Sequence, residues 1–403
     1  MKTSHSIRSV RRGARAMLAV AALGAGLVVP GAADACAGAG AGARPTPTYL
    51  GSGVTANAIS RLQVVGNVGA PGSGAYHAFA YGLRTGKRVD LGTLGGLDSD
   101  ASAAYDNIVA GWAYTRVPGQ SRAFVVTRPG VTRMVDLGTL GGSNSSAGAV
   151  NADFVVGWAN TAGDDARHAF RYRIGTKRMT DLGTLGGRDS IPNGVDQAAY
   201  GSTVVGYSDT AGNTAYHAFA TRGRKMIDLG TLGGSNSDAT AVDGNVVIGW
   251  AETADGSLHA FYDDLRHPRM VDLGTLTGTD SEALAVHGDY IAGWYAFRES
   301  RTIPFVYNMR THTMKDMTAY RGSMTNMITG VGRGVVSGFS SAPGKFVPWV
   351  FDVRAGKYIA LPSKYVSPAG YPGPTVDVNA DNVVAGNGVD GAGVAQAVVW
   401  KWK

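Results

Sequence analysis

The stretch Asp-Leu-Gly-Thr-Leu-Gly-Gly at residues 90–96 decides how this chain folds, because it recurs at a nearly fixed interval. It starts again at Asp136, Asp181 and Asp228, returns as Asp-Leu-Gly-Thr-Leu-Thr-Gly at Asp272, and fades to Asp-Met-Thr-Ala-Tyr-Arg-Gly at residue 316. The steps between these starts are 46, 45, 47, 44 and 44 residues. A period of this length means that one supersecondary unit is repeated, so the fold must be understood from the array.

Two further landmarks recur in step with this signature phrase. An apolar pair followed by Gly and then an aromatic or polar residue lies at 64–67, 109–112, 155–158, 204–207, 247–250, 291–294, 335–339 and 383–387. His-Ala-Phe or a relic of it starts at His77, Arg122, His168, His217, His259, Ile303, Val347 and Gln396. The chain therefore contains eight units.

Each unit divides into four short strands. The 59 Gly in 403 residues suit many tight turns, and β-branched or aromatic runs bounded by turn residues are frequent. In the third unit we expect strands at 147–150, 154–159, 168–172 and 178–185, the last carrying the signature phrase. Four antiparallel strands in about 45 residues are typical of a propeller blade, so the domain is predicted to be all-β.

The two ends of the chain complement each other. The eighth unit, 375–403, stops before any signature phrase, whereas Thr-Tyr-Leu-Gly-Ser-Gly at 48–53 resembles part of that phrase. Pairing of this segment with residues 396–402 would close the ring and leave no exposed edge. We therefore expect an eight-bladed β-propeller whose last blade is completed by the N-terminal strand. The alternatives are a seven-bladed ring with a divergent extra segment, or an open β-solenoid.

The N-terminal region reads as a targeting segment. Four arginines within residues 8–15 precede an apolar stretch at 16–29 that is too short to span a bilayer, and Ala-Asp-Ala at 33–35 resembles a cleavage site. We expect a signal peptide at 1–35, a flexible Gly/Ala/Pro spacer at 36–47 and the propeller at 48–403. Export to the extracellular space or the cell envelope follows, and no transmembrane segment is expected in the mature chain.

Cys36 is the only cysteine, so no intramolecular disulfide can form, and this residue is a candidate lipid anchor.

Residues 1–35 hold five Lys or Arg and one Asp, so cleavage lowers the formal charge from +7 to 7 − 4 = +3. This modest charge argues against nucleic-acid binding.

The coupled His-Ala-Phe, Val-Val-Gly-Trp and Asp-Leu-Gly-Thr-Leu-Gly-Gly phrases resemble those of the bacterial extracellular HAF-repeat family, over nearly all of the mature chain. The resemblance implies a secreted or envelope protein and no settled activity. The last three units depart from it at Ile303-Pro-Phe, Val347-Pro-Trp and Gln396-Ala-Val.

The repeated polar and aromatic residues have a structural interpretation. The histidines could be imagined as a metal ring, but one per blade would lie far from the next, so we expect polar networks within the blades and no metal or cofactor. We expect the tryptophans to pack between blades rather than to stack on sugars. These predicted repeat residues are Asp90, Asp136, Asp181, Asp228 and Asp272; His77, His168, His217 and His259; and Trp112, Trp158, Trp250 and Trp294.

Charge separates by face. In a four-stranded meander the first and third turns emerge on one side, and the third turn is basic in unit after unit. The predicted basic face includes Arg88, Arg133, Lys177, Arg178, Arg224, Lys225 and Arg269. The links between blades, expected on the opposite side, are acidic or amidic: Asp98, Asp100, Asn144, Asp189, Asn236, Asp238, Asp280 and Glu282.

No G-x-S-x-G, H-E-x-x-H or P-loop motif occurs in the sequence. A non-catalytic binding or scaffolding propeller is favoured, with an anionic polysaccharide or an envelope protein as the partner. Lys and Arg on exposed hairpins also have a simpler explanation, because they keep hairpins solvated and discourage edge pairing. A polysaccharide-active enzyme using Asp196, His287, Asp289 or Asp377 and a purely structural surface component are the alternatives.

Overall fold

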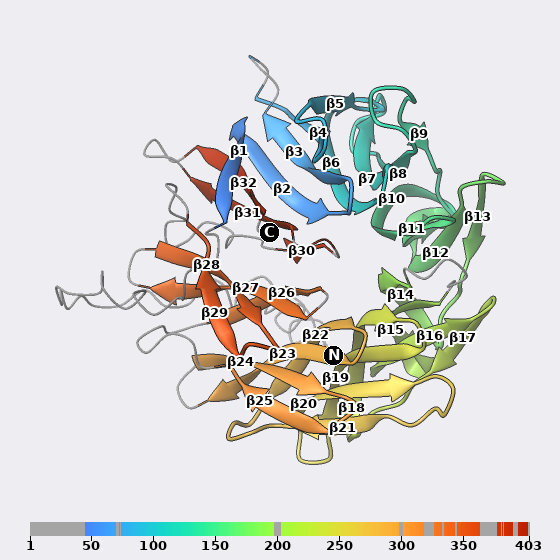
Figure 1. Ribbon diagram of the computed structural model, residues 1–403. Coiled ribbons are helices and arrows are strands. Elements are labelled where there is room, and N and C mark those ends of the chain that lie inside the picture. The colour runs from blue at the N-terminus through green and yellow to red at the C-terminus, as the bar shows by residue number, and fades with distance from the viewer. Residues whose placement is uncertain are drawn as a thin grey trace, which may run out of the picture.

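The computed structural model describes residues 45–69, 72, 74–196, 203–297, 301–317, 326–332, 334–342, 345–362, 377–379, 381, 383–389 and 394–401. Among these residues, eight antiparallel sheets of four strands form a ring (Figure 1). The predicted eight-bladed β-propeller is thereby confirmed, and the chain forms neither a seven-bladed ring nor an open solenoid. The predicted signal peptide, Cys36 and most of the spacer lie outside the described residues.

The blades follow one another along the chain. Blade 1 contains β2 (Val54–Ile59), β3 (Gln63–Gly69), β4 (Tyr76–Gly82) and β5 (Arg88–Gly92). Blade 2 contains β6 (Gly95–Tyr105), β7 (Ile108–Thr115), β8 (Ser121–Val126) and β9 (Val135–Asp136). Blade 3 contains β10 (Gly141–Val150), β11 (Phe154–Thr161), β12 (Arg167–Arg173) and β13 (Arg178–Asp181). Blade 4 contains β14 (Gly186–Val195), β15 (Val204–Thr210), β16 (Tyr216–Arg222) and β17 (Lys225–Asp228).

The second half of the ring has the same order. Blade 5 contains β18 (Gly233–Asp243), β19 (Val246–Thr253), β20 (Leu258–Asp264) and β21 (Val271–Gly274). Blade 6 contains β22 (Ser281–His287), β23 (Tyr290–Phe297), β24 (Arg301–Asn308) and β25 (Thr313–Asp316). Blade 7 contains β26 (Asn326–Val331), β27 (Val335–Ala342), β28 (Lys345–Asp352) and β29 (Lys357–Ala360). The first strands of successive blades contact one another and surround the ring axis.

Blade 8 joins both ends of the chain. β30 (Asp377–Val378), β31 (Val383–Val389) and β32 (Ala395–Lys401) come from the C-terminal end, and β1 (Thr46–Ser52) pairs with β32 as the outermost strand. Two side-chain amides fasten this blade to blade 1: Asn387 exchanges two 2.8 Å hydrogen bonds with the backbone of Ala56, and Asn379 donates to the Ser60 carbonyl at 2.9 Å. The predicted closure is therefore confirmed, with β1 starting two residues before the expected boundary at 48.

Each inner strand of blades 1 to 7 contains a β-bulge. The bulged residue shifts the register against the second strand, and where it is polar its side chain can reach the next blade. Asn193 donates to the Ala239 carbonyl at 2.9 Å, and Thr240 donates to the Ala283 carbonyl at 2.7 Å. The seven bulged residues are Asn57, Ser102, Gly148, Asn193, Thr240, Leu284 and Thr329.

In blades 1 to 7, the Gly of the second-strand landmark packs against this inner strand. Gly157 pairs with Ala147 on one side and with Phe170 on the other, and a Cβ at Gly157 would lie 2.0 Å from the Ser146 carbonyl oxygen. Phe170 is fully buried in a hydrophobic cluster that combines residues of blades 2 and 3, including Val125. The landmark phrases thus specify a close backbone approach and an apolar core between blades.

Strand boundaries differ from the predicted ones within the signature phrase. In the third unit the fourth strand ends at Asp181, because Asp181 Oδ1 accepts a hydrogen bond from the Gly183 amide at 2.7 Å and Gly183 has a φ of +71°. The next inner strand already begins at Gly186, and β10 begins at Gly141 rather than at 147. The phrase is therefore a short strand, a turn and the start of the following blade.

Replacing Gly157 by Ala should destabilise the protein by roughly 1–3 kcal/mol, because the new methyl group meets a backbone carbonyl that cannot rotate away. Gly175→Ala in the same blade is the control, since no atom lies within 4 Å of its added Cβ. Thermal unfolding followed by circular dichroism measures both. Equal midpoints for the two variants would show that the close approach is not required.

Candidate functional site

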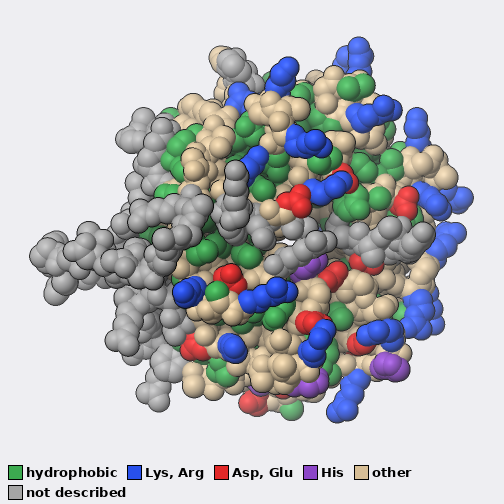
Figure 2. All heavy atoms as spheres, viewed as in Figure 1, with side chains coloured by type: hydrophobic (Ala, Val, Ile, Leu, Met, Phe, Trp, Pro, Cys, Tyr) green, Lys and Arg blue, Asp and Glu red, His purple; other side chains and the backbone are tan. Residues whose placement is uncertain are grey.

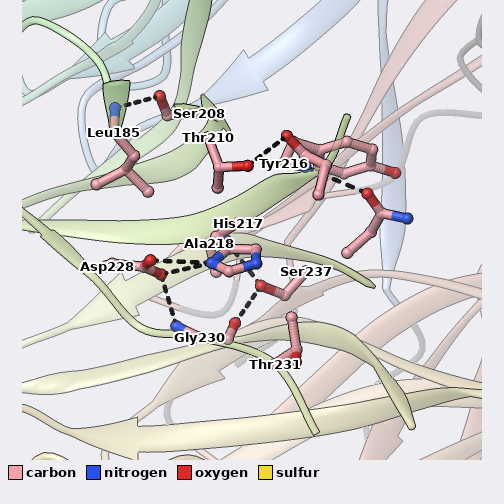
Figure 3. Close-up of polar contacts among 12 residues, drawn as sticks. Leu185, Ser208, Thr210, Tyr216, His217, Ala218, Asp228, Gly230, Thr231 and Ser237 are labelled. Atoms are coloured by element: carbon pink, nitrogen blue, oxygen red, sulfur yellow. Dashed lines mark hydrogen bonds and ion pairs between the residues drawn. The ribbon is translucent and has the colours of Figure 1, made fainter. Parts of the chain in front are cut away.

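A buried serine links three segments at the junction between consecutive blades. At the junction of blades 4 and 5 (Figure 3), the Ser237 hydroxyl accepts a hydrogen bond from the Ala218 amide at 2.8 Å and donates one to the Gly230 carbonyl. We call this arrangement the serine bridge. It recurs at Ser99, Ser145, Ser190 and Ser281, and all five serines are at most 1% exposed.

The repeated His and Asp contact each other within their own blade in blades 1, 3, 4 and 5. His217 Nδ1 lies 2.9 Å from both carboxylate oxygens of Asp228, and Asp228 Oδ1 also accepts a hydrogen bond from the Gly230 amide (Figure 3). The same pairs form between His77 and Asp90, His168 and Asp181, and His259 and Asp272, at 2.9–3.0 Å. In blade 2, Arg122 replaces the histidine, and Asp136 keeps its bond from the Gly138 amide.

In the pair formed by His168 and Asp181, the contact shifts the pKa values of both groups. The hydrogen bond with Asp181 raises the pKa of His168 above its ordinary value, against the smaller lowering by burial. Burial raises the pKa of Asp181, but the hydrogen bonds from His168 and the Gly183 amide outweigh it and lower that pKa overall. Both shifts favour the charged pair.

The acidic links between blades are not loops, which corrects the sequence-based expectation. Asp98, Asn144, Asp189 and Asn236 lie inside the long inner strands, and Asp280 immediately precedes β22. Each accepts a hydrogen bond at 2.8–3.2 Å from the backbone amide that opens the third strand of the preceding blade. Asp100, Asp238 and Glu282 also lie in inner strands, where Asp100 and Asp238 accept bonds from Asn57 and Asn193 of the preceding blade.

The tryptophans of the landmark phrase make several kinds of contact. Trp250 packs edge-on against Tyr216 of blade 4, with ring centroids 6.1 Å apart. Trp112 contacts Tyr114, and Trp158 lies under the Arg167 guanidinium, each within its own blade. Trp294 lies across from Pro304 in β24.

The third turns and the first turns meet on one face of the ring. The Ile174 amide of a third turn donates to the Asp153 carbonyl of a first turn at 2.9 Å, and equivalent bonds join Leu83 to Leu62 and Leu265 to Asn245. All seven residues of the predicted basic face are exposed, on the outer strands and turns of blades 1 to 5. Arg88 also donates to the Leu50 carbonyl of β1 at 3.2 Å.

The positive charges on this face are unevenly neutralised. Arg266 pairs with Asp264 at 2.7 Å and Arg310 with Asp289 at 2.9 Å, in blades 5 and 6. In blades 2 to 4, Arg133, Lys177, Arg178, Arg224 and Lys225 form no ion pair with any other described residue. Figure 2 shows Lys and Arg side chains along the edge of the ring over β9 to β17, with several Asp and Glu side chains nearer the middle.

The first turns carry acidic residues that sequence reasoning did not assign to this face. Asp106 pairs with Arg61 at 3.1 Å, Asp153 is exposed, and Asp289 pairs with Arg310. The first turns lie nearest the ring axis and the third turns farthest from it. The inner part of the face thus carries carboxylates, two of them paired with arginine, and the outer edge in blades 2 to 4 carries cations with no ion-pair partner among the described residues.

The four residues considered for catalysis lie on or beside the inner strands of blades 4, 6 and 8. Asp196 is 3% exposed and accepts a hydrogen bond from the Gly244 amide at 3.1 Å. His287 lies 3.6 Å from Asp243, Asp289 pairs with Arg310, and Asp377 starts β30. In the described part of the chain, no three His, Cys, Asp or Glu side chains are grouped so that they could hold a metal ion.

Replacing Ser145 by Ala should leave the Ala123 amide and the Gly138 carbonyl buried without this partner, at a cost of about 1–3 kcal/mol for each group. Ser146→Ala is the matched control, because the neighbouring Ser146 side chain is half-buried and makes no hydrogen bond with another described residue. Denaturant unfolding compares the two. A control as destabilising as Ser145→Ala would contradict the serine bridge.

The contribution of His168 to stability should depend on pH. Its raised pKa means that the stabilisation is complete below about pH 6.5 and is lost as the pH rises through the folded-state pKa. The lowered pKa of Asp181 means that its stabilisation is present above about pH 3.9 and is lost in stronger acid. His168→Gln should therefore reduce the free energy of unfolding more at about pH 5.5 than at about pH 9.

The control for this pH dependence is His267→Gln, because His267 is exposed and forms no ion pair with a described residue. Its effect should be small at both pH values. A loss for His168→Gln that is constant or larger at high pH would contradict the charged pair.

No helix among the described residues has the length and apolarity to cross a membrane.

No family model and no curated protein matches this sequence. Among solved structures, the chain is similar to prolyl endopeptidases, with 10% identity, a TM-score of 0.53, and coverage of 86% of this chain and 55% of the other. It is also similar to Porphyromonas gingivalis dipeptidyl peptidase 4, with 9% identity, a TM-score of 0.53, and coverage of 89% and 60%. The chain therefore spans a little over half of these proteins, and the likeness concerns the propeller fold alone.

Proposed function

We propose that this protein is an exported, non-catalytic binding propeller of the cell envelope or extracellular space, and that its basic face binds an anionic polysaccharide. The observation that carries the proposal is the gathering of third-turn Lys and Arg on the face where the first and third turns meet. In blades 2 to 4 five of these cations have no ion-pair partner among the described residues. Such a field attracts polymers that carry many like negative charges.

The repetition of the blades supports binding rather than catalysis. A polyanion contacts many cations weakly, and a ring offers similar turns at regular intervals around its edge. Catalysis needs a few groups at one place, whereas Asp196 and Asp289 are already engaged by a backbone amide and by Arg310. An envelope protein with an acidic surface is the second kind of partner that this face would suit.

Export rests on the N-terminal sequence pattern. Cleavage after Ala35 would place Cys36 at the mature N-terminus, where a lipid would anchor the propeller to a membrane. Mass spectrometry of the protein isolated from its host distinguishes a lipidated Cys36 from a free one. Recovery of the uncleaved chain from the cytoplasm would overturn the exported state.

The mature protein should bind acidic glycans on a glycan array, and binding should weaken as salt screens the exposed charges. Neutralising Arg133, Lys177, Arg178 and Lys225 to Gln should reduce the binding by about tenfold or more, since several weak contacts are lost together. Salt-insensitive binding, or binding to neutral glycans alone, would overturn the proposal. Release of sugar fragments by the purified protein would show an enzyme instead.

A further inference from the structure

Two guanidinium groups of blade 3 share one aromatic ring. Arg171 and Arg173 are two residues apart on β12, so their side chains leave the same face of the strand. Their Cζ atoms lie 5.0 and 5.7 Å from the centroid of Phe154, at the start of the neighbouring β11. The Ile174 amide, bonded to the Asp153 carbonyl, fixes the adjoining turn. This stacking holds two like charges in a defined place.

Blade 4 adds a third positive charge to the same place. Burial lowers the pKa of the Arg171 guanidinium below its ordinary value, and the nearby charges of Arg224 and then Arg173 lower it further. Arginine keeps its charge under such shifts, so the three groups bring positive charge to one place on the surface. Guanidinium groups bind oxyanions through charge-assisted hydrogen bonds. We call Arg171, Arg173, Arg224 and Phe154 the cationic seam.

The surroundings of the seam are cationic on the outside and carry one exposed carboxylate toward the ring axis. Lys177, Arg178 and Lys225 lie on the adjoining outer turns and strands, all exposed. Asp153, next to Phe154, is the acidic residue of the neighbouring first turn. A flat anionic surface laid across the whole face would meet the Asp153 carboxylate, whereas a linear polymer can follow the outer edge and avoid it.

We propose that the cationic seam between blades 3 and 4 is the primary oxyanion site for a linear acidic polysaccharide that runs along the outer edge of the ring. The seam takes a carboxylate or sulfate group of the sugar, because guanidinium groups bind both with paired hydrogen bonds. This inference rests on the proposed function. It adds where on the basic face the polysaccharide binds and along which path the polymer runs.

The test compares two triple variants that remove the same charge. Arg171→Gln, Arg173→Gln and Arg224→Gln together remove the seam, and Arg84→Gln, Arg354→Gln and Lys357→Gln remove three exposed cations of blades 1 and 7. Affinity for polygalacturonate, which carries carboxylates, and for heparin, which carries sulfates, is measured by calorimetry. We expect the seam variant to lose about tenfold or more and the control about twofold or less for at least one polymer.

Unfolding midpoints show whether each variant is folded. If the seam triple fails to fold, the single variant Arg224→Gln replaces it, with Arg354→Gln as the control, because both side chains are exposed. We then expect a loss of about threefold against no change.

The outcomes separate the seam from the proposed function. Equal losses for the two triple variants overturn the seam and leave the basic face as the binding surface. No binding of the wild-type protein to either polymer overturns both. Binding to vesicles of phosphatidylglycerol, with none to the polymers, overturns the polysaccharide in favour of a membrane surface.

Discussion

The buried hydroxyl of the serine bridge joins segments that no strand pairing connects. Ser190, for example, belongs to the first strand of blade 4, yet it satisfies the Ala169 amide of the third strand and the Gly183 carbonyl of the last turn in blade 3. Both backbone groups would otherwise be buried at the edge between two sheets, where neither sheet supplies a partner. Because one serine serves both groups, the positions of blades 2 to 6 are each tied to the turn of the preceding blade. This fixed spacing constrains the other residues at these junctions.

The fixed spacing explains which residues are free to vary. Gly157, Phe170 and Ser190 are each held by a steric or hydrogen-bonding constraint, and so are their counterparts in other blades. The third turns lie farthest from the axis and outside this network, so they can accumulate Lys and Arg. The inner turns hold Asp and Asn instead, since their side chains and carbonyls bond across to the next blade, as from Asn151 to the Asp196 carbonyl at 2.8 Å. The charge pattern is a product of the architecture as much as of selection for a ligand.

Sequence reasoning succeeded where one short phrase determines geometry. The echo of the signature phrase at residues 48–53 was enough to predict the closing strand, because a missing fourth strand leaves an edge that needs pairing. It failed at strand limits, because two glycines of the same phrase have different roles: Gly183 lies in the turn after β13, and Gly186 starts β14. It also could not predict the seam, because the stacking of Arg171 on Phe154 depends on register between strands and the nearness of Arg224 depends on two blades meeting.

The shared last blade means that ring closure follows the formation of the other blades during synthesis. Asn387 bonds to Ala56 across 331 positions of the chain, and β1 has no partner until β32 has been synthesised. Blades 1 to 7 need only neighbours in sequence and can form as they emerge, whereas closure must wait for the final residues. Loop-closure entropy grows only slowly with length, so the delay is one of synthesis more than of search. A chain truncated before residue 395 would therefore keep most of its blades but leave the outer edge of blade 8 open to pair with another copy.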